Sequence, residues 1–175
     1  MAVPERIAWA IGQLDISAGD RLLEVGCGRG VAIAEIAPLL IDGHITGLDR
    51  SDSAINSAEE RNRASISSGK AALVQAALAD WSSTTPPFDK IFAVNVNLFW
   101  LEAARELKRI RSLLTPEGRL YLFFEPPSAG QVPTIEHAIA VRLKAAGYVL
   151  ERTMYGPSPK PPLLGMVARP GAVPS

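Results

Sequence analysis

Several features are scarce in this 175-residue sequence, and each scarcity excludes a class of protein. A single cysteine cannot form an internal disulfide. No spacing of His, Cys, Asp and Glu is typical of a metal site, so we expect no metal. The charge is balanced, with 18 Lys and Arg residues against 18 Asp and Glu residues. This balance disfavours nucleic acid as a partner, because a phosphate backbone attracts basic proteins.

Signals for export or membrane insertion are also missing. The first residues lack a basic segment followed by an apolar core, and no apolar run approaches the ~20 residues of a membrane span. Hydrophobic residues nevertheless make up 47% of the chain. A single domain of this size buries roughly 70% of its extended surface, which needs such a core. We therefore expect one cytoplasmic domain over residues 1–175, with no membrane partner.

Five short, nearly continuous apolar runs divide the chain up to residue 125. Such runs are typical of strands that are covered on both faces, as in a parallel sheet. They occupy residues 21–26, 44–49, 71–76, 90–95 and 119–125.

Segments with helical spacing separate these runs. In residues 101–114, apolar side chains fall on one face and charged side chains on the other, which predicts one helix ending at a turn over residues 115–118. Shorter helical patterns cover residues 31–40, where Pro38 kinks or ends the helix, and residues 51–64. The alternation of strand and helix indicates a parallel sheet with right-handed crossovers.

The last part of the chain follows another pattern. Residues 134–147 are typical of a helix, and residues 148–155 and 163–169 of an antiparallel hairpin joined by the proline-rich loop 156–162. The predicted fold class is therefore α/β, a Rossmann-like, doubly wound, mostly parallel sheet closed by a C-terminal antiparallel hairpin. Residues 169–175 are expected to form a frayed tail.

A glycine-rich loop follows the first predicted strand, at Gly26, Gly28 and Gly30. In a doubly wound sheet, ligands bind beyond the carboxyl ends of the strands, where the strand order reverses. Val31 stands where the fingerprint of a dinucleotide site requires its third glycine. Glu24 precedes the loop; its carboxylate would repel a pyrophosphate but suits an ammonium or sulfonium group. These residues predict a small cationic cofactor.

At these residues the sequence resembles the class I S-adenosylmethionine-dependent methyltransferases, whose first motif is an acid-x-Gly-x-Gly-x-Gly run after strand one. Residues 24–30 match this motif. The resemblance implies that Glu24 and the loop residues bind the cofactor, with Cys27 as a small residue filling the loop. The loop residues are Gly26, Cys27, Gly28 and Gly30.

The resemblance continues along residues 15–168 and implies further cofactor contacts. Asp49, at the end of the second strand, would accept hydrogen bonds from both ribose hydroxyls, and Arg50 would flank the adenine. Family members commonly carry an acid after the third strand that binds the adenine amino group. Here Ala77 takes that place, with Leu78 offering its backbone N–H and Asp80 as a possible substitute.

The fourth predicted strand resembles the family motif that begins with Phe88-Asp89 and ends with Asn95-Val96. This resemblance places Asn95 beside the methionine part of S-adenosylmethionine. The N-terminal segment 1–17 is expected to lie as a helix over the cofactor side.

Methyl transfer from a sulfonium is an in-line displacement, so positioning alone can supply ~7–11 kcal/mol and a dedicated catalytic residue is optional. A hydroxyl acceptor still needs a base. Glu125 is a candidate base, or a solvated loop carboxylate. Asn97 is a candidate for orienting the acceptor, or a helix cap. Trp9 and Trp100 either line an acceptor pocket or belong to the core.

The sequence therefore predicts transfer of a methyl group from S-adenosylmethionine to an O or N atom of a small molecule, with S-adenosylhomocysteine as product. A homodimer is possible. Two alternatives stay open at this point: an NAD(P)-dependent oxidoreductase, because Asp49 and the glycine loop suit either ligand, and a partner protein that binds the cofactor without catalysis.

Overall fold

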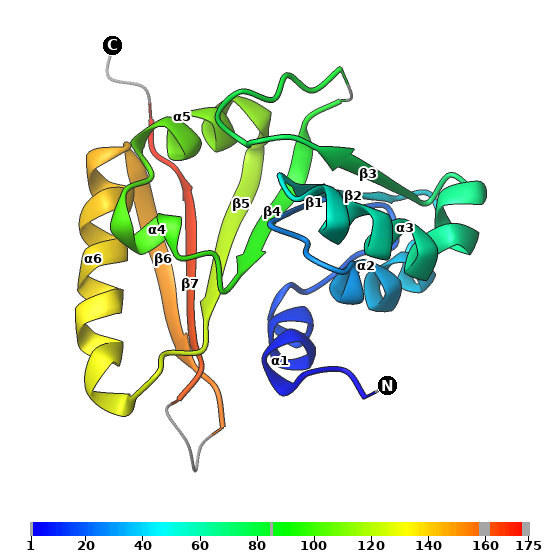
Figure 1. Cartoon of the computed structure of the whole chain (residues 1–175). Coiled ribbons are helices and arrows are strands. Elements are labelled where there is room, and N and C mark those ends of the chain that lie inside the picture. Colours follow the sequence, from blue (N-terminus) through cyan, green and yellow to red (C-terminus); the bar gives the residue numbers. More distant parts are fainter. Residues whose placement is uncertain (1, 85, 158–161, 173–175) are drawn as a thin grey trace.

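The computed structural model describes residues 2–84, 86–157 and 162–172. All described strands belong to one sheet in the order β3-β2-β1-β4-β5-β7-β6 (Figure 1). The first five strands in chain order pair in parallel, whereas β7 runs antiparallel to both β5 and β6. This arrangement confirms the predicted fold class. The strands are β1 (Arg21–Val25), β2 (His44–Asp49), β3 (Ala71–Gln75), β4 (Phe88–Val94), β5 (Leu114–Phe124), β6 (Tyr148–Tyr155) and β7 (Leu164–Pro170).

Helices cover both faces of the sheet (Figure 1). One face carries α1, α2 and α3, and the other carries α4, α5 and α6. The helices are α1 (Glu5–Gln13), α2 (Val31–Ile36), the 3-10 turn η1 (Ala37–Leu39), α3 (Asp52–Ser67), α4 (Leu98–Leu101), α5 (Ala104–Leu113), η2 (Ala129–Gln131) and α6 (Val132–Ala145). No helix in the described part of the chain is long and apolar enough to cross a membrane.

The two helical layers produce two hydrophobic cores, one on each side of the sheet. Successive residues of a strand point to opposite faces, so Leu22 and Phe92 pack with α1 and α2. Leu23 and Ile91 pack with the helices of the other face. Both faces of each central strand are therefore buried, which explains why the strand sequences are apolar without alternation.

Pro38 ends the α-helical part of residues 31–40, as predicted. α2 stops at Ile36, and the next residues form the 3-10 turn η1 with proline in its first turn. A proline lacks the backbone N–H that a helix interior needs, so the chain leaves the helix here.

The single helix predicted over residues 101–114 is wrong. The segment breaks after α4, where Glu102 is extended, and α5 begins only at Ala104. Arg142 of α6 donates a hydrogen bond from Nε to the Leu101 carbonyl at 3.0 Å, which satisfies the end of α4. Leu101 consequently stays 55% exposed instead of joining the buried face. Contacts with a distant helix decided this boundary.

The turn predicted at residues 115–118 lies inside a strand. β5 already begins at Leu114, which pairs with Phe88, and the next pairing joins Arg119 to Lys90. The pairing register therefore shifts across residues 115–118 of β5. The predicted start of this strand at residue 119 was therefore too late.

The expected frayed tail over residues 169–175 is also wrong at its beginning. β7 continues to Pro170, and the Gly171 N–H donates to the Gly147 carbonyl at 2.8 Å. Residues 173–175 lie outside the described residues. So does part of the hairpin loop, residues 158–161, whereas the antiparallel pairing of β6 with β7 is confirmed.

Tyr148 ties β6 to α5 and allows a test of this packing. Its hydroxyl is buried and donates to the Leu107 carbonyl at 2.8 Å. We expect Tyr148→Phe to lower the free energy of unfolding by roughly 1 kcal/mol, because one buried hydrogen bond is lost. Urea denaturation measures the change. Tyr155→Phe is the matched control, since its hydroxyl bonds Glu136 on the surface and should contribute less. Equal effects of the two substitutions would contradict this assignment.

Candidate functional site

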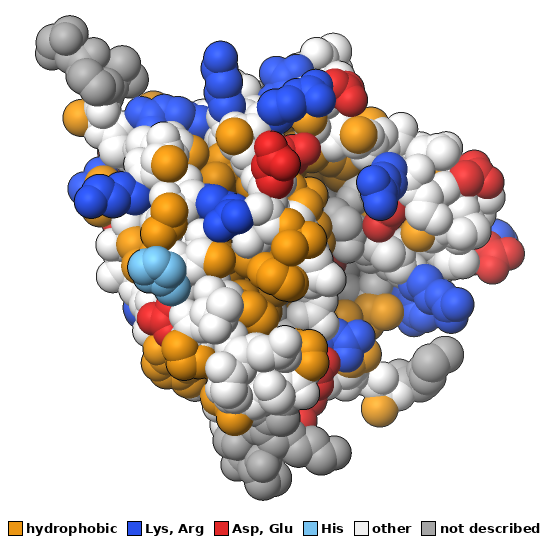
Figure 2. Space-filling view, turned by 60° about the vertical axis from the view of Figure 1, so that its left-hand side comes forward, with side chains coloured by type: hydrophobic (Ala, Val, Ile, Leu, Met, Phe, Trp, Pro, Cys, Tyr) orange, Lys and Arg blue, Asp and Glu red, His pale blue; other side chains and the backbone are white. Residues whose placement is uncertain are grey.

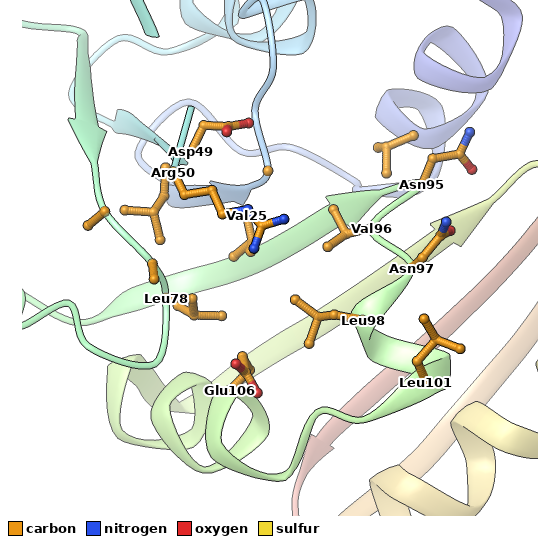
Figure 3. Close-up of a pocket in the computed structure, with 15 residues that line it drawn as sticks. Val25, Asp49, Arg50, Leu78, Asn95, Val96, Asn97, Leu98, Leu101 and Glu106 are labelled. Atoms are coloured by element: carbon orange, nitrogen blue, oxygen red, sulfur yellow. The ribbon is translucent and has the colours of Figure 1, made fainter. Parts of the chain in front are cut away.

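A cavity of about 580 Å³ opens at the carboxyl ends of β1, β2 and β4 (Figure 3). The strand order reverses at this position, because the chain proceeds from β1 toward β3 on one side and from β4 toward β5 on the other. Crevices of this kind bind ligands in doubly wound sheets. The lining residues are Val25, Gly26, Leu48, Asp49, Arg50, Ala76, Ala77, Leu78, Val94, Asn95, Val96, Asn97, Leu98, Leu101 and Glu106.

The three glycines of the loop all have positive φ, each with different surroundings. A Cβ on Gly26 would lie 2.6 Å from Val96 Cγ2, and one on Gly30 would overlap with Asn62 Nδ2. A Cβ on Gly28 would meet nothing within 4 Å. Gly26 and Gly30 are therefore required by packing as well as by backbone conformation, whereas Gly28 borders open space.

Two side chains of α3 hold the outer part of the glycine loop. Arg61 Nε donates to the Arg29 carbonyl, and Asn62 Nδ2 donates to the Gly30 carbonyl, each at 3.0 Å. The N–H groups of Gly26 and Cys27 donate to the Leu48 carbonyl at the end of β2. These bonds orient the peptide groups of the loop. The α3 contacts were missed by sequence reasoning, because nothing in the local pattern relates α3 to the loop.

Glu24 is 4% exposed, and its Oε2 has no hydrogen-bond partner among the described residues. Burial raises the pKa of the Glu24 carboxyl well above its usual range, and the charge of Asp49 raises it further. A buried acceptor without a partner is costly. A cationic or hydrogen-bond-donating group placed beside Glu24 would relieve this cost.

Cys27 fills space inside the loop, as expected. Burial raises the pKa of its thiol, and the charges of Glu24 and Asp49 raise it further. Its Sγ would lie 3.0 Å from a Cβ placed on Gly47. The thiol is therefore held in its neutral, unreactive form and acts as a small core side chain.

Asp49 is oriented by two backbone N–H groups. Oδ2 accepts from Gly28 N, and Oδ1 accepts from Ser51 N, both at 2.9 Å. A carboxylate oxygen carries two lone pairs, so each oxygen can accept one further hydrogen bond in the cavity. The carboxylate is thus positioned before any ligand arrives.

Asn95 joins the ends of β4 and β5. Its φ is +56°, a left-handed conformation that asparagine tolerates better than most residues. The Asn95 N–H donates to the Phe123 carbonyl at 2.8 Å, and its Oδ1 accepts from Glu125 N at 2.6 Å. Asn95 therefore fixes the wall of the cavity on the side of β4.

Comparison with known proteins decides the family. Residues 23–120, more than half of the chain, match the family described as "Methyltransferase domain". The chain belongs to the methyltransferase domain family. The predicted membership of the class I S-adenosylmethionine-dependent methyltransferases, and the prediction of an enzyme, are thereby confirmed.

Similar proteins include the uncharacterised methyltransferase YdaC of Bacillus subtilis, 27% identical over 80% of this chain and 77% of YdaC. The O-methyltransferase rstn1 of Aspergillus nomiae is 30% identical over 66% of this chain and 52% of its own length. Magnesium protoporphyrin IX methyltransferase from Synechocystis PCC 6803, crystallised with bound SAH, has the same fold. It is 19% identical, with a TM-score of 0.68 over 93% of this chain and 78% of its own.

The cavity of this methyltransferase brings together part of the cofactor-binding residues predicted from the sequence, whereas Glu24, Cys27, Gly28 and Gly30 do not line it. Gly26, Asp49, Arg50 and Asn95 line it, as do Ala77 and Leu78. The Leu78 N–H donates to no other group among the described residues. Asp80 does not line the cavity; it pairs with Arg105 at 2.8 Å on the surface.

The two catalytic candidates occupy different positions. Asn97 lines the cavity and occupies the N-cap position of α4, as one interpretation predicted, but its side chain makes no capping hydrogen bond. Its Oδ1 lies 3.4 Å from Trp100 Nε1. Glu125 does not line the cavity, and its carboxylate pairs with Arg6 of α1 at 3.2 Å.

The N-terminal segment does not contribute to the cavity lining. Its Trp9 packs edge-on against Phe123, with ring centroids 5.6 Å apart, and belongs to the core. α1 lies on the face that also carries α2, and its Arg6 pairs with Glu125 just beyond the carboxyl end of β5. Sequence reasoning also missed lining residues such as Leu98, Leu101 and Glu106, which enter the cavity through the docking of α4 and α5.

Alanine substitutions of Gly30 and Gly28 should distinguish a glycine needed for packing from one that borders open space. We expect Gly30→Ala to destabilise the fold, because its Cβ clashes with Asn62 and Ala58. Gly28→Ala should cost about 1–2 kcal/mol for its left-handed backbone but still fold, since its Cβ meets open space. Thermal unfolding and calorimetric titration with S-adenosylhomocysteine measure the two effects. A Gly30→Ala variant as stable as Gly28→Ala would contradict the packing argument.

Glu24→Gln should stabilise the protein without cofactor at neutral pH. The folded state raises the pKa of Glu24, so the wild type loses stability as the pH rises from the ordinary carboxyl range, near 4.5, through the raised value. The variant lacks this titration, so the difference in the free energy of unfolding between variant and wild type should widen as the pH rises through this range.

Urea denaturation over a pH series measures this difference, with the exposed Glu59→Gln as control. A difference that does not change with pH would refute the explanation.

Proposed function

We propose that the cavity binds S-adenosylmethionine and that the protein transfers its methyl group to an O or N atom of a small molecule. The observation that carries this proposal is the oriented Asp49 carboxylate in the cavity, which accepts a hydrogen bond from Gly28 N. Directly before the glycine loop, Glu24 is buried with an unpartnered carboxylate oxygen. A volume of about 580 Å³ suits a ligand of this size.

The residues present fit the chemical groups of this cofactor. Glu24 and the glycine loop suit the cationic amino-acid end, because a buried carboxylate without a partner favours positive charge. Asp49 has free lone pairs for the two ribose hydroxyls. Arg50, Ala77 and Leu78 form the adenine side, and Asn95 fixes the wall at the methionine side. The crystallised relative from Synechocystis, which contains SAH, supports this assignment.

When bound, S-adenosylmethionine supplies an electrophilic methyl group on a positively charged sulfur. This chain contributes mainly by positioning, which can lower the barrier by ~7–11 kcal/mol. Val96, Leu98 and Leu101 form an apolar part of the cavity wall. Asn97 lies in the same wall and can orient the acceptor atom through its amide.

Glu125 is a second candidate for contact with the acceptor. Its ion pair with Arg6 would have to open before the carboxylate could accept a proton. Asn95 nevertheless holds the Glu125 backbone at the carboxyl end of β5, so the side chain starts from a defined position. We assign Glu125 a role only where the acceptor is a hydroxyl that requires a base.

The acceptor side of the cavity is apolar. Leu101 also lines a neighbouring groove of about 670 Å³ between α4, α5 and α6, with mostly apolar side chains. Figure 2 looks onto this side of the molecule and shows hydrophobic side chains gathered in its middle. A small molecule with an apolar body fits this surface better than nucleic acid does. The name of the relative rstn1, an O-methyltransferase, supports oxygen as one acceptor atom. A cytoplasmic location and a homodimer stay predictions from the sequence.

Calorimetric titration tests the cofactor. We expect S-adenosylhomocysteine to bind the wild type, and Asp49→Ala to weaken binding about 10- to 100-fold, because hydrogen bonds from the ribose to a carboxylate are lost. Asp42→Ala is the matched control, since Asp42 is exposed before β2, at the other end of the sheet.

Binding of NAD(H) or NADP(H) without S-adenosylhomocysteine would overturn the proposal in favour of the oxidoreductase alternative. Cofactor binding without turnover on a broad panel of apolar alcohols, phenols and amines would favour a non-catalytic partner protein instead.

A further inference from the structure

Two charged side chains that line the cavity have no partner among the described residues. Asp49 is bound by backbone N–H groups, Asn95 by the Glu125 backbone, and Asn97 by Trp100. Arg50 and Glu106 line the same cavity, yet neither makes a hydrogen bond or an ion pair within the described part of the chain. Of these two, only Glu106 offers an acceptor.

The position of α5 explains why Glu106 reaches the cavity. Arg105 pairs with Asp80 at 2.8 Å, and Arg109 Nη2 donates to Ser82 Oγ at 3.1 Å, so α5 lies against the loop that follows β3. Glu106 is half-buried at this junction and lines the cavity together with Leu78 (Figure 3). The same junction turns Asp80 away to the surface.

This end of the cavity therefore presents a donor and an acceptor from two elements. The Leu78 N–H donates no hydrogen bond to any described residue. The Glu106 carboxylate, when ionised, is a hydrogen-bond acceptor and not a donor. The complementary edge of a ligand has a ring nitrogen that accepts and an exocyclic amino group that donates. An aminopyrimidine edge, as in adenine, has this pattern.

We propose that Glu106 is the residue that selects the adenine base, accepting a hydrogen bond from its amino group while Leu78 N–H donates to the adjacent ring nitrogen. This inference rests on the proposed cofactor. It assigns to α5 the role that the sequence had suggested for Asp80. A hypoxanthine base reverses both groups, with a carbonyl oxygen and a ring N–H, so it would oppose the carboxylate and the backbone N–H alike.

The test compares S-adenosylhomocysteine with S-inosylhomocysteine, its deaminated analogue, by calorimetric titration. We expect the wild type to prefer the adenosyl compound, and Glu106→Ala to lose about 10- to 100-fold in affinity for it. The preference should shrink to the part that the Leu78 N–H supplies. Glu106→Gln should bind the inosyl compound better than the wild type does, because an amide can also donate to the carbonyl oxygen.

Glu102→Ala is the matched control, since Glu102 is exposed between α4 and α5 and does not line the cavity. Alanine at position 106 should preserve α5, because alanine has a high helix propensity. Thermal unfolding verifies that each variant is folded. Wild-type binding of S-adenosylhomocysteine with an unchanged preference in Glu106→Ala would overturn this inference alone. Failure of the wild type to bind S-adenosylhomocysteine would overturn the proposed cofactor as well.

Discussion

The divergence of the chain at the carboxyl ends of β1 and β4 is the constraint on which the site depends. Strands buried on both faces need helices on both sides, so the connections from β1 and from β4 lead to opposite faces of the sheet. The cavity lies in the space between these two diverging connections. The glycine loop, Asp49 and Asn95 meet there because each follows a strand that ends at the same edge.

Electrostatics gives this cavity its preference for a ligand. Burial raises the pKa of the Glu24 carboxyl, and the nearby charge of Asp49 raises it further. Burying the Glu24 carboxyl next to the glycine loop costs stability. The hydrophobic cores on both sides of the sheet offset this cost, because they provide most of the stability of the fold. Functional sites commonly hold such unfavourable groups, since the ligand relieves them. A methyltransferase cofactor with a sulfonium and an ammonium group has the matching charge.

Contacts between distant segments define the rest of the cavity. Arg61 and Asn62 of α3 hold the glycine loop from behind, and Asn95 holds the backbone of β5. On the opposite wall, α5 docks on the loop after β3 through Arg105. The wall beside the acceptor depends on the break between α4 and α5, which leaves Leu101 exposed to the cavity and to the neighbouring groove.

The sequence by itself determined the strands, the order of the elements, the glycine loop and Asp49, because these depend on local hydrophobic patterns and on motifs of a few residues. Tertiary structure alone decided the break after Leu101, the surface position of Asp80 and the entry of Glu106 into the cavity. Periodicity describes which face of a helix is apolar, but it contains no information about which distant carbonyl or carboxylate that helix will meet. Those contacts form only when the helices pack on the sheet, and they add residues to the site that the local motifs do not predict.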